Sequence, residues 1–188
     1  MIDEQQSNKQ QPMTLTKNHT SSFLKSMYEF VELLVFTLLT VFLISAFLCQ
    51  HSLVKGPSML QTLENEQHLL VYSLFYEPSE GDIIVFQDLT KSEKAMVKRV
   101  IATAGQHVHI DETGVYVDEK KLDESEYVYI DNDFYEYSEC DVIVPDGCLF
   151  VMGDHRNNST DSRMFGVIDQ RSVLGKVWIR ISPFTIFD

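Results

Sequence analysis

The sequence predicts a mostly β domain of antiparallel sheets carried on a single N-terminal transmembrane helix. Three observations support this prediction: an uncharged apolar run near the N-terminus, a series of short β-branched and aromatic segments after it, and no long amphipathic helix between those segments. The last observation argues against a parallel sheet, since parallel strands need helical crossovers. With 188 residues, the chain is long enough for one domain with a sizeable core plus appendages.

The charge distribution separates a leader from an acidic domain. Residues 1–50 hold four acids against three lysines, whereas residues 51–188 hold 24 acids against 12 Lys and Arg. The formal net charge is −13 and the pI is about 4.8. Nucleic-acid binding needs clustered Lys and Arg, so we expect no nucleic-acid partner.

Residues 29–50 are predicted to form a transmembrane anchor. The uncharged run Leu33–Cys49, LLVFTLLTVFLISAFLC, would rise about 26 Å as a helix against a hydrocarbon core of about 30 Å, and Phe30–Glu32 covers the difference. A helix buried in a globular core is disfavoured because the run has no polar face. A cleaved signal peptide is disfavoured because the tail before the run is long and no small-residue cleavage motif follows.

Residues 1–28 are predicted to be a disordered cytoplasmic tail, because they are mainly Gln, Asn, Ser and Thr at their start. Three lysines precede the anchor and only Lys55 follows closely, so the positive-inside bias places the N-terminus in the cytoplasm. Residues 51–188 would then form an extracytoplasmic domain. The chain is thus expected to be a single-pass protein of the cell membrane, with the lipid bilayer as a partner and an oligomeric state that the sequence does not indicate.

Seven segments of this domain are predicted as strands, because they combine β-branched and aromatic residues and are bounded by turn residues. They are Leu69–Tyr72, Asp82–Phe86, Val97–Ile101, Val108–Ile110, Val115–Val117, Val142–Val144 and Leu149–Met152. The last two flank Pro145-Asp146-Gly147, a turn signal that predicts a hairpin.

Ser58 and Lys98 are candidates for nucleophilic catalysis. A serine hydroxyl needs a neighbouring base to take its proton. A lysine with an ordinary pKa of about 10.4 leaves only about one amine in 2,500 neutral at pH 7, so it serves as a base only where burial lowers that pKa. Lys98 lies among apolar residues in a predicted strand, where alternation sends Lys98 and Arg99 to opposite faces. The alternative is that both are solvated residues of an edge strand.

His155 offers a second candidate base. It lies in the polar run Gly153–Gly166, GDHRNNSTDSRMFG, which has more small polar and charged residues than a core needs. The spacing permits a Ser-His-Asp triad of Ser58, His155 and either Asp154 or Asp161, since triad members meet in space rather than in sequence. This triad is the weaker hypothesis, because no G-x-S-x-G motif surrounds the serine.

Four segments in order resemble type I signal peptidases, which are membrane-anchored Ser–Lys proteases. SMLQTL from Ser58 resembles S-M-x-P-T-L, GDIIVF from Gly81 resembles G-D-I/V-V-x-F, and VKRVI from Val97 contains K-R-V-I. The run from Gly153 matches G-D-x-R-x-N-S-x-D-S-R-x-x-G at every specified position. The motifs lie within about residues 54–166, and the size and single anchor resemble the short members of Gram-positive bacteria.

The resemblance implies a signal-peptidase-like catalytic domain that cleaves signal peptides from exported preproteins after small residues. Ser58 would attack the scissile carbonyl, Lys98 would be the general base, and Ser159 would orient the lysine amine. The residues expected to support the site are Ser159, Asp161, Arg163 and Asp154. The residues expected to line apolar substrate pockets, or else to belong to the ordinary core, are Val54, Met59, Leu63 and Val97. The Ser58 N–H is expected to stabilise the oxyanion, because Gly56 stands where some members add a serine hydroxyl.

The chain departs from the family pattern at several places. Gln61 stands where Pro is usual, Ala102–Gln106 replaces a G-L-P-G-D-like stretch, and His155 stands where Asn is common. An alternative is therefore a non-catalytic or narrowly specialised paralogue acting in surface-protein or pilus assembly. A non-catalytic relative would be expected to lose the nucleophile or the base, and both are present. An extracellular binding module without a site would leave the polar run unexplained.

No metal or cofactor is expected. Cys140 and Cys148 flank the predicted hairpin, and the sequence is compatible with a disulfide between them or with two free thiols. The Cys and His spacings match no zinc motif. Acidic residues crowd residues 111–141, but without the D-x-D-x-D-G calcium loop they predict a solvated surface.

Overall fold

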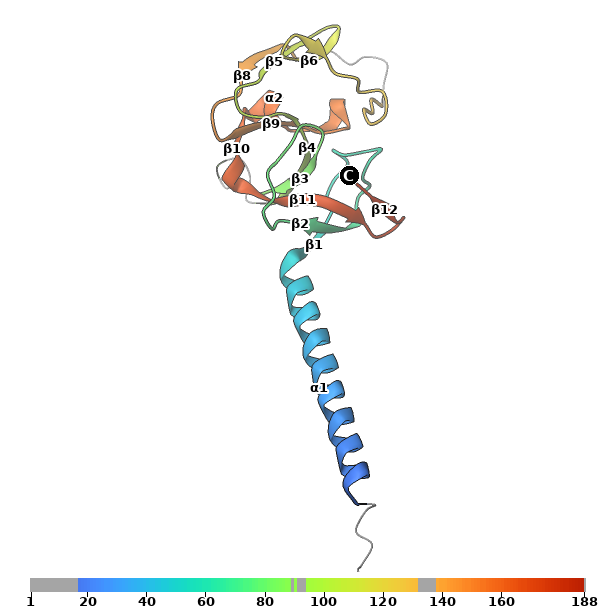
Figure 1. Ribbon diagram of the computed structural model, residues 1–188. Helices are drawn as coiled ribbons and strands as arrows, with labels where there is room; N and C mark the ends of the chain where they lie inside the picture. Colours follow the sequence, from blue (N-terminus) through green and yellow to red (C-terminus); the bar gives the residue numbers. More distant parts are fainter. Residues whose placement is uncertain (1–16, 89, 91–93, 132–137, 188) are drawn as a thin grey trace, which may run out of the picture. The chain divides into compact units, whose positions relative to one another are not determined.

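The computed structural model describes residues 17–88, 90, 94–131 and 138–187 (Figure 1). The chain divides into two units at residues 45 and 46. Helix α1 spans Lys17–Leu48, so it begins inside the segment expected to be a disordered tail, and residues 1–16 lie outside the described residues. Its stretch Ser22–Leu43 is long and apolar enough to cross a membrane.

The sequence of α1 explains its form. It contains no Pro or Gly, so no residue interrupts the ladder of backbone hydrogen bonds. The hydroxyls of Thr37 and Thr40 donate to the carbonyls of Leu33 and Phe36, each at 2.8 Å, which satisfies these polar groups inside the helix. All side chains from Ser22 to Leu43 are exposed in the structure. A long apolar helix whose described side chains are exposed has the character of a membrane anchor.

The second unit is built from two antiparallel sheets. The larger contains, in spatial order, β1 (Cys49–Leu53), β2 (His68–Tyr72), β11 (Val173–Arg180), β3 (Ile83–Phe86), β4 (Met96–Ala102), β9 (Cys148–Met152) and β10 (Ile168–Asp169), with β12 (Thr185–Ile186) paired to β11. The smaller contains β7 (Lys120–Lys121), β6 (Gly114–Val117), β5 (His107–Asp111) and β8 (Cys140–Ile143). Short helical turns lie at η1 (Arg156–Asn158), α2 (Ser162–Phe165) and η2 (Gln170–Ser172). The prediction of a mostly β, antiparallel fold with one apolar helix is confirmed.

The predicted hairpin around Pro145-Asp146-Gly147 is wrong. The turn exists, since Cys148 N–H donates to the Pro145 carbonyl at 3.1 Å. However, β8 before the turn pairs with β5 in the small sheet, whereas β9 after it pairs with β4 and β10 in the large sheet. A turn motif reverses the chain, but it does not decide which strands offer the better apolar face.

Strand β11 was not predicted, although it lies in the middle of the large sheet. It pairs with β2 on one side and β3 on the other. Gly175 interrupts its β-branched pattern, yet only glycine fits there. Its φ is +155°, and a Cβ would collide with the carbonyl of Tyr72.

Three apolar clusters form the core among the described residues of the domain, and one of them positions the nucleophile segment. The segment after β1 buries Met59 and Leu63 against residues of β2, β3 and β11. Burial of such a side chain contributes roughly 1.5–3 kcal/mol. Two buried anchors on either side of the turn from Leu60 to Thr62 therefore hold this segment against the large sheet. A separate cluster joins β4 and β9 to the small sheet.

Candidate active site

The structure brings Ser58 and Lys98 together. Ser58 precedes the buried Met59, and Lys98 lies on β4 opposite Ile84 of β3. The Lys98 Nζ lies 2.6 Å from the Ser58 Oγ, which is hydrogen-bond distance. Lys98 is 3% exposed, whereas Ser58 is half-buried and remains within reach of a substrate. The pair has the geometry of a nucleophile and its base.

The surroundings of Lys98 favour its neutral form. Loss of hydration on burial lowers the pKa of its ammonium to about 8, even though the negative charges of Asp161 and Asp154 act in the opposite direction. The positive charge of Arg163 adds to the lowering. At neutral pH a useful fraction of the amine is then free to accept a proton.

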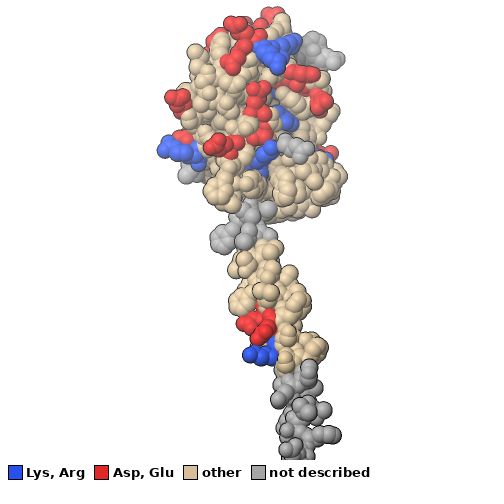
Figure 2. Space-filling model, in the orientation of Figure 1, with Lys and Arg blue, Asp and Glu red and all other residues tan. Residues whose placement is uncertain are grey.

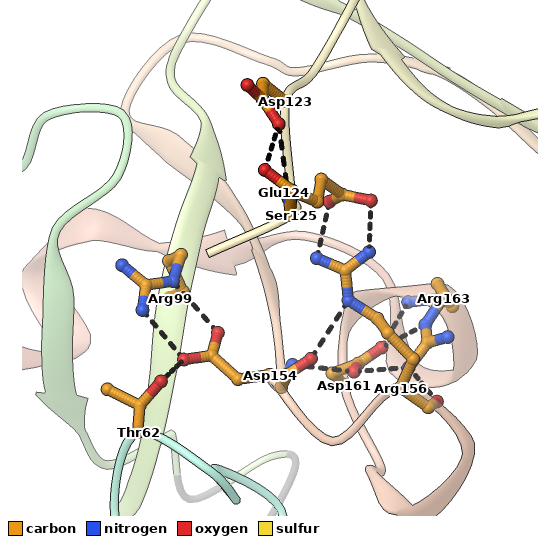
Figure 3. A network of polar contacts seen from close by, with 10 residues as sticks. Thr62, Arg99, Asp123, Glu124, Ser125, Asp154, Arg156, Asp161 and Arg163 are labelled. Carbon is orange, nitrogen blue, oxygen red and sulfur yellow. Dashed lines mark hydrogen bonds and ion pairs between the residues drawn. The ribbon is translucent and has the colours of Figure 1, made fainter. Parts of the chain in front are cut away.

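Arg99, the next residue on β4, pairs with Asp154 (Figure 3). Two hydrogen bonds of 2.9 and 2.7 Å join the guanidinium to the carboxylate. Thr62 donates its hydroxyl to the same carboxylate. Asp154 therefore connects β4, the nucleophile segment and the polar run, three segments that are distant in the sequence.

Asp161 and Arg163 form a second buried pair (Figure 3). Asp161 also accepts the backbone N–H of Gly153 at 2.9 Å and caps α2. Burial alone would raise the pKa of Asp161, but the ion pair with Arg163 and the hydrogen bonds from Arg163 and the Gly153 N–H bring it below its ordinary value. The carboxylate therefore stays charged and fixes the polar run. Among the described residues, Ser159 makes no hydrogen bond to Lys98.

Gly153 lies at a close approach between the polar run and the nucleophile. A Cβ added there would overlap the hydroxyl of Ser159 and the backbone carbonyl of Ser58. The glycine thus lets the polar run lie directly against the backbone of the nucleophile. The motif has a glycine here because there is no room for a side chain, and the glycine itself has no chemical role.

His155 lies close to the nucleophile segment but does not act on its hydroxyl. Its backbone N–H donates to the Ser58 carbonyl at 3.1 Å, and its Nδ1 lies 3.1 Å from the Pro57 carbonyl. Among the described residues, the group that contacts the Ser58 Oγ is Lys98. This geometry favours the lysine over the histidine as base.

A buried ion pair between Glu124 and Arg156 is not predicted from the sequence. The Arg156 side chain is fully buried, and its two terminal nitrogens bond the two carboxylate oxygens of Glu124 (Figure 3). Its Nε donates to the Gly153 carbonyl at 3.1 Å. The ring of Tyr127 lies 4.1 Å from the Arg99 guanidinium and 6.0 Å from that of Arg156. Glu124 therefore fixes the Arg156 side chain, which in turn holds the polar run at the Gly153 carbonyl.

Glu124→Gln should destabilise the chain by about 3–5 kcal/mol, because it leaves the Arg156 charge buried without its partner. Chemical denaturation at neutral pH would measure the change. The matched control is Glu126→Gln, an exposed position two residues on, which should shift stability by less than about 0.5 kcal/mol. Equal effects of both substitutions would contradict a specific role for the pair.

The four expected pocket residues lie together. The side chains of Val54, Met59 and Leu63 share one buried cluster, and Val97 packs against it. They therefore form one apolar group beside the nucleophile segment.

The remaining expectations concern the surface. Cys140 and Cys148 are free thiols. Figure 2 shows acidic side chains spread over the visible face of the domain, and Glu112, Asp123 and Asp141 are exposed. Among the described residues, no group of three or more His, Cys, Asp and Glu is arranged to hold a metal ion.

Comparison with known proteins supplies the family. A family model described as signal peptidase, peptidase S26, matches residues 27–182. The chain is 37% identical to probable signal peptidase I-1 of Synechocystis sp., over 82% of each chain. It is 36% identical to signal peptidase I of Bacillus caldolyticus, over 84% of this chain and 90% of that one.

Two further matches are more distant. Signal peptidase IB of Staphylococcus aureus is 28% identical over 87% of this chain and 93% of its own length. A crystal structure of a signal peptidase I from Enterococcus faecalis aligns with a TM-score of 0.45 and 26% identity, covering 54% of this chain and 97% of that chain. The family model and the curated relatives cover most of the chain, and they confirm the resemblance found in the four motifs. The chain belongs to the signal peptidase family, peptidase S26, as an enzyme of the type I signal peptidase class.

Proposed function

We propose that the chain cleaves signal peptides after small residues, with Ser58 as nucleophile and Lys98 as general base. The observation that carries this proposal is the 2.6 Å contact between the Lys98 Nζ and the Ser58 Oγ. The lowered pKa of Lys98 and the bracing of the site by Asp154 and Asp161 support it. The presence of both reacting groups in contact speaks against the non-catalytic alternative.

The reaction proceeds through an acyl-enzyme. The neutral Lys98 amine accepts the Ser58 proton as Oγ attacks the scissile carbonyl carbon, and the negative charge collects on the carbonyl oxygen. Among the described residues, the Ser58 N–H has no hydrogen-bond partner, so it is free to donate to this oxyanion. Collapse breaks the C–N bond, and the Lys98 ammonium protonates the leaving amine. Water then attacks the ester carbon and Lys98 takes its proton; the C–O bond to Ser58 breaks, the Lys98 ammonium returns the proton to Oγ, and the acid product leaves.

The substrate end of the site is apolar. Val54, Met59, Leu63 and Val97 would contact the small side chains before the cleaved bond. Helix α1 would hold the enzyme in the membrane with its N-terminus in the cytoplasm and residues 51–188 outside. A signal peptide is itself an apolar segment in the bilayer, so an anchored enzyme meets its substrate at the membrane surface.

The pH dependence of cleavage follows from the pKa of Lys98. Only the neutral amine accepts a proton, so kcat/KM should rise about tenfold per pH unit below pH 8 and level off above it. The measurement is the initial rate on a synthetic signal-peptide substrate without ionisable groups near the cleavage site, from pH 6 to pH 10. A rate independent of pH over this range would contradict a lysine base.

The function itself is tested by incubating the detergent-solubilised chain with a panel of signal-peptide precursors. Mass spectrometry of the products should show one cut after a small residue by the wild type and none by Ser58→Ala. Thr90→Ala, a change of an exposed hydroxyl, should cut like the wild type. If the wild type cuts none of the precursors, the assembly-paralogue alternative takes precedence.

A further inference from the structure

The peptide unit before the nucleophile is held from its carbonyl side. The Pro57 carbonyl accepts the backbone N–H of Leu60 at 3.1 Å and lies 3.1 Å from the Nδ1 of His155. This carbonyl belongs to the same planar, trans unit as the Ser58 N–H. Whatever fixes the Pro57 oxygen therefore also fixes the direction of the Ser58 N–H.

His155 is itself firmly held. It is 3% exposed, its Nε2 lies 3.2 Å from the Asp131 Oδ2, and the ring of Tyr129 lies 4.9 Å from its ring. Tyr129 N–H donates to the Asp154 carbonyl at 2.8 Å, and Arg156 N–H donates to the Tyr129 carbonyl at 3.0 Å. These contacts surround the imidazole, and its Nδ1 lies toward the Pro57 carbonyl.

The hydrogen-bond partners define what the imidazole does. A backbone carbonyl offers only an acceptor, so the Nδ1 must carry a proton and donate it to the Pro57 oxygen. A donor at the carbonyl polarises the whole peptide unit and makes its N–H a stronger donor.

We propose that His155 is a positioning residue for the oxyanion donor: it holds and polarises the Pro57–Ser58 peptide, so that the Ser58 N–H points to the developing oxyanion. This inference rests on the proposed function, since it assigns an indirect role in the same reaction. His155 then assists the transition state indirectly, through the Ser58 N–H, and does not act as a base. Its backbone N–H on the Ser58 carbonyl fixes the following peptide unit as well.

Three variants test the proposal kinetically in the full-length chain. His155→Leu removes the donor, so kcat should fall roughly 10–100-fold while KM changes less than twofold, as expected for an interaction made mainly in the transition state. His155→Asn supplies an amide N–H donor and should restore at least a third of the wild-type kcat. His109→Leu, a half-exposed histidine on β5, should leave kcat unchanged.

A spectroscopic readout separates this proposal from the function. In ¹⁵N-labelled full-length chain in detergent micelles, without substrate, the Ser58 amide proton should shift upfield in His155→Leu and return toward its wild-type position in His155→Asn. If the wild type cuts no precursor, the proposed function fails, while this comparison still tests the contact. Unchanged Ser58 amide shifts in His155→Leu, or an equal loss of kcat in the Leu and Asn variants, would overturn the positioning role.

If His155→Leu does not fold, the Ser58 amide shift and kcat are compared between the wild type and His155→Asn. A kcat below a tenth of the wild-type value in the Asn variant then overturns the positioning role.

Discussion

Lys98→Met should abolish precursor cleavage and at the same time stabilise the folded chain at neutral pH. The loss of the base should lower kcat by about 10²–10⁴-fold. The gain in stability follows from the pKa of Lys98, which is 10.5 in an unfolded chain and about 8 in the folded one. Between these two pKa values the unfolded chain binds more protons, so stability rises with pH across this window and is lowest below it.

The size of the gain follows from the same shift. The buried ammonium costs about 3 kcal/mol below pH 8, and loss of the hydrogen bond to Ser58 offsets about 1 kcal/mol. Lys98→Met should therefore add about 2 kcal/mol to the free energy of unfolding at pH 7. Urea denaturation at pH 7 and pH 10 measures it, and the gain should shrink at the higher pH. Lys55→Met, at an exposed lysine, is the control and should change neither activity nor stability.

The opposite result would be informative. A Lys98→Met chain that is less stable than the wild type at pH 7 would show that the ammonium is well solvated or well paired. In that case the pKa of Lys98 would stay near its ordinary value, and almost none of the amine would be neutral at pH 7 to act as a base.

Gly153→Ala should reduce cleavage by at least about 100-fold and destabilise the chain by about 1–3 kcal/mol, the usual cost of overpacking a close contact. The new Cβ overlaps the Ser58 carbonyl and the Ser159 hydroxyl, so the nucleophile backbone must move. A displacement of about 1 Å at a reacting group is enough for such a loss of rate. Kinetics on a synthetic substrate and thermal unfolding measure the two effects.

Gly147→Ala is the matched control. Its Cβ would meet nothing within 4 Å, but its φ of +70° is unfavourable for alanine. This variant should lose about 1 kcal/mol of stability and keep wild-type cleavage, because it lies in the turn between β8 and β9. Equal activity losses in both alanine variants would show that backbone strain, rather than contact with Ser58, explains the effect at Gly153.

The parts of the fold that the sequence predicted are those with a local signal. The predicted strands carry alternating β-branched residues, and the uncharged run predicted α1. The hairpin failed because strand partners are chosen by burial across the whole domain, and the sequence around Pro145-Asp146-Gly147 does not contain that information. Strand β11 was missed because Gly175 and Lys176 interrupt its apolar pattern, although the glycine is required by the close approach of Tyr72.

The residues of the candidate site divide in the same way, into those with a local sequence signal and those that depend on distant partners. Ser58, Lys98 and Asp161 lie in dense motifs, and the structure places them together. Glu124 and Asp131 lie in an irregular acidic segment, and sequence analysis assigned their neighbourhood to a solvated surface. These two acids differ from their exposed neighbours in their partners in the fold: Glu124 pairs with Arg156, and Asp131 lies beside His155. No periodicity or spacing within the segment indicates such a partner.

The site and rate of acylation distinguish a Ser58 nucleophile activated by Lys98 from any other mechanism. The chain is mixed with a small acyl ester substrate at pH 7, quenched after increasing times and analysed by mass spectrometry of its peptides. We expect one acyl group on Ser58, none in Ser58→Ala, and a rate of labelling at least about 100-fold lower in Lys98→Met. Acylation at another residue, or labelling of Lys98→Met at the wild-type rate, would contradict it.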